Sequence, residues 1–318
     1  NLKVGNLPNC RDMGGRTTVA GGRIKQGLLY RTSGRKYDNG NGTANDEAKN
    51  VIVNQFHLKT EINVADSDGN ALHIDGTTTR NCFMDYGETP YSNLARNANK
   101  LREVFSILGD SNNYPAFYHC RIGTDRTGIC GVALNGLLGV PFNEVIQDYL
   151  FSDFANIGSQ RYMHLTSDPN GDDAAKYINE ILGLPGKNFQ EQMIYALLSI
   201  GIPAQTLQNV IDIMTEGTKV TIPNDISVIS GDKLTNNGGS KKTSSDFSAP
   251  ETYYEISGSS QSVSFEYSLA EEKDIAIVAY LGSTNSSKET KLASGIDLKI
   301  DGVSQNICDK TYWTAGFG

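Results

Sequence analysis

The sequence is short of several features that would place it in a specialised class of protein. It has 318 residues but only five cysteines, too few and too scattered for a disulfide framework. No apolar run approaches the roughly 20 residues that a membrane-spanning helix needs. Acidic residues outnumber basic ones by 36 to 28, and the formal charge of −8 argues against broad binding to nucleic acid or to anionic membranes. What remains is ordinary soluble globular material, long enough for two domains.

One short segment has a clear chemical character. Residues 119–128 read HCRIGTDRTG, so Cys120 precedes Arg126 by six positions, with small and turn-forming residues between them. The preceding residues 115–118 read as a short buried strand, and residues 128–138 as an apolar helix. We therefore expect a strand–loop–helix turn, where backbone N–H groups and the positive end of a helix dipole converge on one point. Such a point binds a phosphate dianion.

The residue types in this segment suit phosphoryl transfer. A helix N-terminus and a nearby arginine can lower a cysteine pKa to about 3.5–7.5, which would make Cys120 a nucleophilic thiolate. Arg126 can hold two phosphate oxygens with its planar fork. Gly123 permits a positive φ or a close backbone approach, Gly128 lets the helix start pack tightly, and Thr127 can donate its hydroxyl to the sulfur. Loop amides and Arg126 supply the charge stabilisation, so we expect neither a metal nor a cofactor.

These residues resemble the signature loop of the cysteine-dependent protein tyrosine phosphatases. The DRTG ending is closer still to a bacterial branch of atypical dual-specificity, lipid-phosphatase-like enzymes. That branch usually opens with NFRDLGG and continues with a basic, hydrophobic segment that ends in Tyr-Arg-Ser. Here residues 9–15 read NCRDMGG and residues 22–33 read GRIKQGLLYRTS. The resemblance covers roughly the first two-thirds of the chain and implies attack by sulfur, a phosphocysteine intermediate and hydrolysis by water.

The resemblance also assigns further residues to the site. Arg11 and Asp12 match family positions and are expected to brace or to line the pocket. His119 is expected to orient the loop and to face away from the pocket. Many members of the branch carry Lys where this chain has Thr124, which weakens an inositol-type assignment, although Arg121 adds a positive charge nearby. The expected substrate-binding residues of the loop are Arg121, Ile122, Gly123, Thr124 and Gly128.

Three aspartates compete for the role of general acid, which must protonate the leaving oxygen. Asp85 follows an expected strand, at an interval before Cys120 that is typical of the movable acid loop in such phosphatases. Asp125 lies inside the loop, where the branch's own aspartate has been assigned this role. Asp66 ends another expected strand and could instead organise the loops. We favour Asp85 slightly over Asp125, and Asp66 comes third.

Hydrophobic periodicity predicts an α/β fold for the front of the chain. Apolar residues recur at helical spacing in residues 92–108, 142–150, 189–200 and 203–214, in addition to residues 128–138. Alternation of these helices with strands indicates a mixed sheet with helices on its faces. Pro203 suits the first turn of the last helix. Cys130 lies in an apolar helix and is expected to be a core residue.

Beyond Gly217 helical periodicity stops. We predict a catalytic domain over residues 1–219, a connecting segment over residues 220–250 and a small all-β, sandwich-like accessory domain over residues 251–318. The polar, Gly/Ser-rich run within the connecting segment, residues 235–245, is expected to be a linker or a long exposed loop. Alternating residues 263–269 predict a half-buried strand. Residues 275–281 and 296–300 are further expected strands, with Asp301-Gly302 as a turn.

The rear domain has a Ser/Thr/Asn-rich surface that is similar to modules appended to exported bacterial enzymes. This favours a secreted or cell-surface location over a cytoplasmic one. The start at Asn1 in place of Met is compatible with a removed leader but says nothing about secretion. A surface glycan or a protein is a conceivable ligand of this domain. The aromatic residues that could form a sugar platform, but more often form sandwich core, are Tyr253, Tyr254, Tyr312 and Trp313.

Three functions stay open at this point. The leading one is a phosphomonoesterase that acts on a phosphorylated protein or a small phosphomonoester, with phosphotyrosine first and dual specificity allowed. The second is a phosphatase of phosphoinositides or inositol phosphates. The third is a phosphate-binding module without turnover, whose rear domain serves adhesion. The intact pair of Cys120 and Arg126 favours an enzyme.

Overall fold

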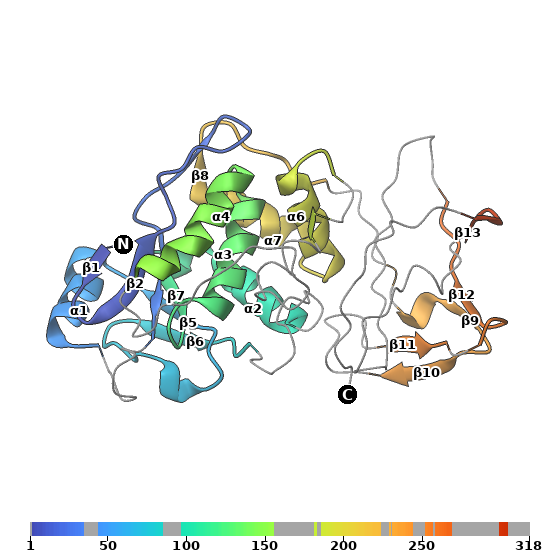
Figure 1. Ribbon diagram of the computed structural model, residues 1–318, viewed down its shortest axis with the longest axis horizontal. Coiled ribbons are helices and arrows are strands. Elements are labelled where there is room, and N and C mark those ends of the chain that lie inside the picture. Colours follow the sequence, from blue (N-terminus) through green and yellow to red (C-terminus); the bar gives the residue numbers. More distant parts are fainter. Residues whose placement is uncertain are drawn as a thin grey trace.

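The computed structural model describes residues 2–34, 44–84, 97–155, 181–182, 186–223, 229, 231–243, 252–256, 258–268 and 299–304. The front of the chain alternates strands and helices, whereas the rear contributes short strands at the far end of the molecule from β1 (Figure 1). The predicted Asp85 and the predicted strand 275–281 lie outside the described residues.

The centre of the front part is a six-stranded mixed sheet with the order β1-β2-β4-β7-β5-β6. The strands β4, β7, β5 and β6 run parallel, and β1 and β2 are antiparallel to their neighbours. This arrangement confirms the predicted mixed sheet. The strands are β1 (Leu2–Val4), β2 (Leu7–Asp12), β4 (Leu29–Ser33), β5 (Thr60–Asn63), β6 (Thr78–Asn81) and β7 (Ala116–Cys120).

Helices cover both faces of this sheet. All five residues of β7 are buried, and because side chains alternate along a strand, Tyr118 packs into the larger core and Phe117 into a smaller core on the other face. The smaller core is closed by α1 (Asp46–Asn50) and the π-helical turn η2 (Val51–Gln55). The larger core is closed by α2 (Ala98–Leu108), α3 (Asp125–Leu137), α4 (Phe142–Leu150), α6 (Phe189–Ser199) and α7 (Ala204–Met214).

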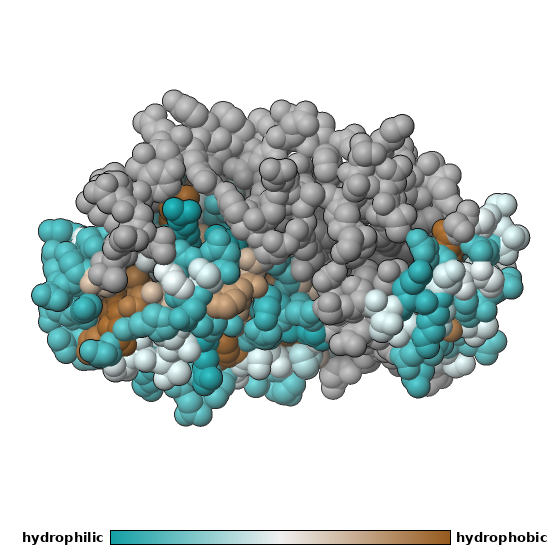
Figure 2. Space-filling view, turned by 90° about the horizontal axis from the view of Figure 1, so that it is seen from below, coloured by the Kyte–Doolittle hydropathy of each residue, from teal (hydrophilic) through white to brown (hydrophobic). Residues whose placement is uncertain are grey.

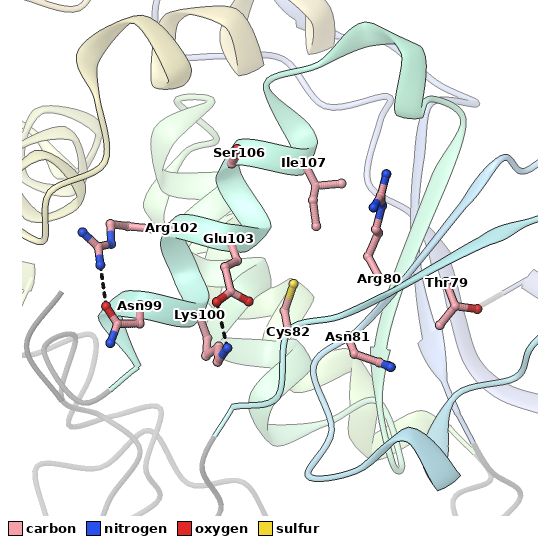
Figure 3. Close-up of a pocket in the computed structure, with 10 residues that line it drawn as sticks. All are labelled: Thr79, Arg80, Asn81, Cys82, Asn99, Lys100, Arg102, Glu103, Ser106 and Ile107. Atoms are coloured by element: carbon pink, nitrogen blue, oxygen red, sulfur yellow. Dashed lines mark hydrogen bonds and ion pairs between the residues drawn. The ribbon is translucent and has the colours of Figure 1, made fainter. Parts of the chain in front are cut away.

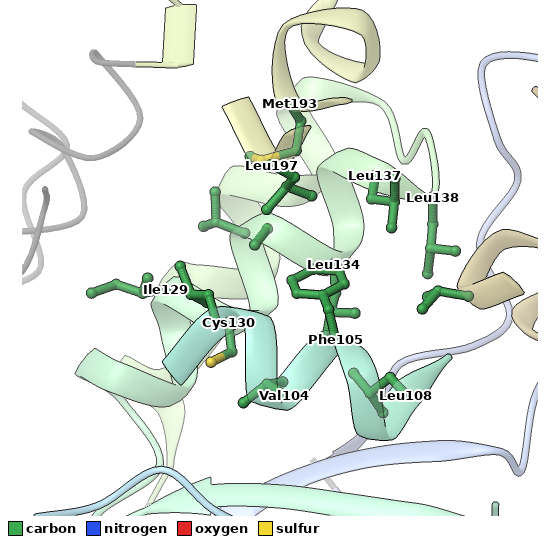
Figure 4. Close-up of a cluster of buried hydrophobic side chains, with 14 of the residues drawn as sticks. Val104, Phe105, Leu108, Ile129, Cys130, Leu134, Leu137, Leu138, Met193 and Leu197 are labelled. Atoms are coloured by element: carbon green, nitrogen blue, oxygen red, sulfur yellow. The ribbon is translucent and has the colours of Figure 1, made fainter. Parts of the chain in front are cut away.

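The helix α3 runs through the middle of the larger core. It is buried along nearly its whole length and packs against α4 and α6. Figure 4 shows side chains of α2, α3 and α6 converging around Leu134. Cys130 is buried there, as predicted, with its Sγ 3.6 Å from the Sδ of Met84. A helix buried on all sides cannot shift without disturbing the core, so its N-terminus is a rigid base for a site.

Most helix boundaries agree with the predictions. The last helix begins directly after Pro203 and buries the predicted stripe, and α6 is capped by Asn188, whose side chain accepts from the N–H of Glu191 at 3.0 Å. The main difference is that α3 begins at Asp125, earlier than the predicted residue 128. Arg126 and the residue after it therefore belong to the first helical turn. The short 3₁₀ turns are Asp68–Asn70, Ser111–Asn113, Phe151–Phe154 and Gly231–Lys233.

The rear part differs from its prediction in two places. The Gly/Ser-rich residues 235–243 form strands, not a linker, because they find partners in β11 and β12. The predicted half-buried strand 263–269 is cut to β12, and Phe265 and Tyr267 beyond it are 43% and 46% exposed. The predicted Asp301-Gly302 turn is confirmed, with positive φ at both residues. The rear strands are β9 (Thr235–Asn237), β10 (Ser240–Thr243), β11 (Thr252–Glu255), β12 (Ser262–Ser264), β13 (Lys299–Ile300) and β14 (Val303–Ser304).

A short strand pair marks the end of the front part. Strand β8 (Thr215–Glu216) follows α7 directly and pairs with β3 (Arg23–Ile24), which ties the chain back to its N-terminal region. On the face seen in Figure 2, the described residues of both parts are mainly hydrophilic, with smaller hydrophobic patches. Among the described helices, none has the length and apolar character needed to cross a membrane.

Candidate active site

The predicted loop lies where β7 ends and α3 begins. Cys120 is the last residue of β7, and Arg126 is the second residue of α3. Both side chains are almost fully buried, at 1% and 3% exposure. Residues 121–124 connect the two elements and end at the N-terminus of α3, where the helix dipole favours a negatively charged group. The structure confirms the predicted order of strand, loop and helix, but it places Cys120 at the end of the strand and Arg126 in the first turn of the helix, whereas the sequence predicts both in the loop.

Two glycines hold this turn in shape. Gly123 has a φ of +74°, and a Cβ atom at this position would lie 2.4 Å from the carbonyl oxygen of Thr32. Only glycine fits, because any side chain would both strain the backbone and collide with β4. Gly128 lies against the ring of Tyr149, which a Cβ would approach to 2.4 Å. The loop is thus pressed against β4 on one side, and the start of α3 against α4 on the other.

The hydroxyl of Thr127 ties the nucleophile to the helix. Its Oγ1 accepts a 2.7 Å hydrogen bond from the backbone N–H of Cys120. Since the Thr127 oxygen accepts this bond, its hydroxyl hydrogen remains available to donate to the sulfur of Cys120. The contact fixes the end of β7 on the first turn of α3.

A buried polar network holds the loop from behind. The Nη2 of Arg31 and the Nδ2 of Asn9 both donate to the carbonyl oxygen of Gly123, each at 2.9 Å. Asn9 has a φ of +63°, which is unusual within a strand and accompanies the turn of its amide toward the loop. Arg11 donates in turn to the Oδ1 of Asn9. Residues from β2 and β4 therefore fix the position of a loop that follows them by some 90 residues or more.

The anchor of this network is Asp148 on α4. Its carboxylate lies 2.8 Å from Arg31, 3.2 Å from Arg11 and 3.0 Å from Arg16. Burial by itself would raise the pKa of Asp148, but the three guanidinium groups outweigh it and lower this pKa to about 2. Burial and the neighbouring Arg31 lower the pKa of Arg11 to about 10. One carboxylate among three arginines leaves a net positive charge beneath the loop.

His119 lies behind the nucleophile, on the opposite side of β7. Its Nε2 is 2.8 Å from Oε1 of Glu61 on β5, and both side chains are fully buried. Burial would raise the pKa of Glu61, but the contacts with His119 and with the N–H of Leu72 lower it below its ordinary value. His119 thus links β7 to β5 through this contact, and its expected role as an orienting or structural residue stays a prediction.

The candidate acids are placed differently. Asp66, just after β5, has its Oδ1 3.9 Å from Nη1 of Arg126 and 2.7 Å from Nδ2 of Asn70. In this position the Asp66 carboxylate can orient the Arg126 guanidinium, which is a structural role in addition to the predicted one of organising the loops. Asp125 is half-buried at the first position of α3. Asp85 follows Met84, whose carbonyl oxygen lies 3.5 Å from Arg126, although Asp85 itself lies outside the described residues.

The remaining predicted residues either belong to the loop or stabilise the turns next to it. In the loop, Arg121 is exposed, whereas Ile122 and Thr124 are buried. Asp12 accepts from the N–H groups of Gly14 and Gly27, each at 2.8 Å, so it fastens two turns together. Of the two predicted roles for Arg11 and Asp12, these contacts favour bracing over lining the pocket. Within the described residues, no group of three or more His, Cys, Asp or Glu side chains could hold a metal ion.

Sequence reasoning did not single out four residues of this site: Asn9, Arg31, Glu61 and Asp148. Two of them belong to segments that carry the family resemblance, because Asn9 opens the NCRDMGG segment and Arg31 lies near the end of residues 22–33, within β4. No local signal marks Asp148, which looks like an ordinary residue of an amphipathic helix. Its role depends on three arginines that the fold brings together from elsewhere in the chain.

Comparison with known proteins agrees with this geometry. The model of the tyrosine phosphatase family matches residues 2–216, about two-thirds of the chain. The chain belongs to the tyrosine phosphatase family. It is therefore a cysteine-based phosphatase, and the match ends at β8, where the front part of the fold also ends. No curated protein sequence matches it.

Solved structures give weaker likenesses. The catalytic domain of the PP-IP phosphatase Siw14 from S. cerevisiae, in complex with citrate, is 16% identical with a TM-score of 0.33, covering 48% of this phosphatase and 80% of that chain. TpbA from P. aeruginosa is 13% identical with a TM-score of 0.33, covering 54% of this phosphatase and 86% of that chain.

Proposed function

We propose that this phosphatase hydrolyses phosphate monoesters through Cys120, with phosphotyrosine in a protein as its leading substrate. The observation that carries the proposal is the joint placement of Cys120 at the end of β7 and Arg126 in the first turn of α3. A loop held from behind by Arg31 and Asn9 connects them. Such a loop offers preorganised donors to a phosphoryl group, and preorganised donors are the largest source of catalysis in reactions of this kind.

The reaction proceeds in two displacements. In the first, the Cys120 thiolate attacks phosphorus, an S–P bond forms, the P–O bond to the leaving group breaks, and the leaving oxygen takes a proton from a general acid. In the second, water attacks phosphorus, gives a proton to the same carboxylate, and the S–P bond breaks to return the thiolate. Arg126 and the loop N–H groups bind the phosphoryl oxygens throughout.

Asp85 is the proposed general acid, and Asp125 is the alternative. Met84 brings the chain within reach of Arg126 directly before Asp85, which supports the first assignment. Asp125 has the advantage of lying on the loop itself. In pH–rate profiles with p-nitrophenyl phosphate, replacing the true acid by Asn should remove the alkaline limb of the profile. A profile with both limbs intact excludes the residue that was replaced.

The preference for phosphotyrosine rests on the loop charges. Thr124 is fully buried and neutral at the position where many members of the branch carry Lys, so the loop gains no cation there. Arg121 is the observation that keeps inositol phosphates as a second candidate, because it is exposed in the loop and can meet a further phosphate. Turnover of a phosphotyrosine peptide and of inositol hexakisphosphate, measured side by side by phosphate release, decides between them.

The test of the mechanism uses p-nitrophenyl phosphate, which needs only the loop. The wild-type chain should hydrolyse it, and Cys120→Ser should abolish the reaction. Arg126→Ala should lower kcat/KM by at least about 10²-fold, because it removes the charged donor to the phosphoryl group. Activity that persists in Cys120→Ser would overturn the nucleophile, and an inactive wild type would overturn the function.

The rear strands are proposed to form an all-β accessory unit that is separate from the catalytic one. The family match and the strand pair β3–β8 both end near residue 216, and the rear strands pair only with each other within the described residues. A fragment of residues 1–219 should then fold and hydrolyse p-nitrophenyl phosphate at the full-length rate. An insoluble or inactive fragment would contradict the proposed boundary.

A further inference from the structure

A cleft of about 820 Å³ runs between the edge strand β6 and the helix α2 (Figure 3). Four consecutive residues of and just beyond β6, 79–82, line one wall. Side chains of a strand alternate between its faces, so a wall made by consecutive residues follows the edge of the strand and not one face. The other wall is the polar side of α2, with lining residues at helical spacing: Asn99, Lys100, Arg102, Glu103, Ser106 and Ile107.

Among the described residues, none pairs with the outer edge of β6. β6 is the last strand of the sheet, and within the described residues it pairs only with β5. The N–H groups of Thr78 and Cys82 donate to the carbonyl oxygens of Lys59, just before β5, and Asn63, at its end, at 2.7 and 2.9 Å. Because hydrogen-bonding direction alternates along a parallel strand, the N–H and C=O groups of Thr79 and Asn81 face away from β5. An extended peptide can pair with such an edge.

The cleft is cationic although the chain carries a charge of −8. Lys100 and Glu103 neutralise each other, with Nζ and Oε1 2.8 Å apart. That pair leaves Arg80 and Arg102 as the excess charges. In Figure 3 Arg80 extends from β6, and Arg102 lies beside Asn99 on α2 with its guanidinium directed away from β6. Arg80 is exposed and forms no ion pair with any other described residue.

The cleft leads to the catalytic loop. The strands β6, β5 and β7 are parallel, so their carboxyl ends meet at the edge of the sheet that carries Cys120. Cys82 at the end of the cleft is two residues from Met84, which spans at most about 7 Å of extended chain. The carbonyl oxygen of Met84 lies 3.5 Å from the Nη1 of Arg126. Cys82 in the wall of the cleft is therefore close along the chain to the residue that contacts Arg126.

We propose that this cleft binds an extended, acidic segment next to the phosphorylated residue of a protein substrate. Its backbone pairs with the edge at Thr79 and Asn81, and its carboxylates meet Arg80, with Arg102 adding positive charge from α2. The open edge favours a peptide as the occupant, because a small polyphosphate has no backbone to match it. The inference rests on the proposed function and adds a substrate preference to it.

The first experiment compares phosphotyrosine peptides of equal length. One has three Glu residues before the phosphotyrosine, one has three Glu residues after it, and one has Ser at all of these positions. The wild-type chain should show a KM about fivefold lower for at least one acidic peptide, since solvent-accessible ion pairs contribute modestly. The difference should shrink in 0.5 M NaCl, because salt screens exposed charges. Equal KM values for all three peptides would overturn the proposal.

The second experiment locates the preference. Arg80→Glu should remove or reverse it, read as the ratio of kcat/KM for the peptide to kcat/KM for p-nitrophenyl phosphate. The matched control is Lys49→Glu on α1, which changes the charge equally but lies on the opposite face of the sheet. If both variants change the ratio alike, only the overall charge matters and the cleft is excluded as the binding site.

A binding measurement separates this proposal from the proposed function. Cys120→Ser should bind the preferred acidic phosphopeptide more tightly than the Ser-flanked one, as followed by fluorescence anisotropy, and Arg80→Glu in the same background should abolish the difference. This measurement needs no turnover, so it tests the cleft even if p-nitrophenyl phosphate is not hydrolysed. Inositol hexakisphosphate is then added as a competitor of the bound peptide. If it competes equally well in Cys120→Ser and in the double variant with Arg80→Glu, this anion binds outside the cleft. Competition that is lost with Arg80→Glu would replace the peptide as the occupant.

Discussion

The Nη2 of Arg31 donates a 2.9 Å hydrogen bond to the carbonyl oxygen of Gly123, in the middle of the phosphate-binding loop. Arg31 is fully buried, and its other terminal nitrogen lies 2.8 Å from Asp148. Burial would lower the pKa of Arg31, but the contact with Asp148 outweighs it, and the pKa is raised above its ordinary value. Arg31 therefore stays charged, and it joins the loop to a fixed anchor on α4.

This relationship predicts that Arg31 positions the loop for catalysis. Arg31→Ala should lower kcat for p-nitrophenyl phosphate by about 10²-fold, because small displacements of catalytic groups are that costly. Arg31→Lys keeps the charge but cannot reach both Gly123 and Asp148, so it should fall between Ala and the wild type. The matched control is Arg23→Ala, which removes an exposed arginine from β3. Steady-state kinetics and thermal unfolding are measured together, and an unchanged kcat in a folded Arg31→Ala variant would refute the role.

The second prediction concerns replacement of Gly123, where a side chain would suffer both backbone strain and a steric clash. Its φ is +74°, and an added Cβ would lie 2.4 Å from the carbonyl oxygen of Thr32. Gly21 has a φ of +89° with no atom within 4 Å of its Cβ position, so Gly21→Ala isolates the backbone strain. Gly21→Ala should lower the free energy of unfolding by about 1–2 kcal/mol, and Gly123→Ala by more. Urea unfolding compares the two, and equal losses would show that the collision with β4 is relieved.

The local parts of this structure could be predicted from sequence, because they depend on near neighbours. The strand, loop and helix around Cys120 lie within about 20 residues, and each residue of that segment has a strong preference. The buried stripe of α7 repeats at helical spacing and was found for the same reason. By contrast, Asp148 acquires its role from arginines on β2 and β4 and on the chain between them, more than 110 residues away. Nothing in its own neighbourhood reveals these partners.

In the rear of the chain, by contrast, a clear local pattern predicted a longer strand than the structure contains. The alternating residues 263–269 have the period of a strand with one buried face, but alternation specifies a strand only where a core covers that face. Phe265 and Tyr267 are 43% and 46% exposed, and the strand ends at Ser264. The Asp301-Gly302 turn was predictable because its cause is local: both residues tolerate positive φ.

The buried pair of Glu61 and His119 yields a third prediction, about stability. The carboxylate also accepts from the N–H of His73 at 3.1 Å and from the hydroxyl of Thr79 at 2.9 Å. Glu61→Ala should lower the free energy of unfolding by about 3–5 kcal/mol, because several buried donors lose their acceptor at once. Glu61→Gln keeps an acceptor oxygen and should cost less. Urea unfolding measures both, and a loss below about 1 kcal/mol for Glu61→Ala would contradict the pair's structural role.

The coupling between Glu61 and His119 can be measured separately. A double-mutant cycle of Glu61→Ala and His119→Ala should give a coupling free energy of about 0.5–3 kcal/mol, since the two side chains are in direct contact. Additive losses would mean that each residue acts through other partners. Because His119 adjoins Cys120 in β7, the kcat of each folded variant also reports whether this link holds the nucleophile in place.

The last prediction concerns acid stability and follows from Asp148. Its pKa is lowered from an ordinary value of 3.8 to about 2 in the folded chain. Between these values the unfolded chain binds a proton at this carboxyl that the folded chain does not, so stability falls as the pH drops from about 4 toward 2. The shift corresponds to about 2 kcal/mol that is fully present above pH 4 and lost below pH 2.

Asp148→Asn should lack this part of the pH dependence, and it should be less stable at pH 7 because three buried or half-buried arginines lose their counter-charge. Urea unfolding at several pH values, with the exposed Asp46→Asn as control, checks this expectation. If Asp148→Asn and the wild type lose stability in parallel between pH 4 and pH 2, the carboxylate is not held ionised by its arginines, and the anchor assigned to the catalytic loop must lie elsewhere.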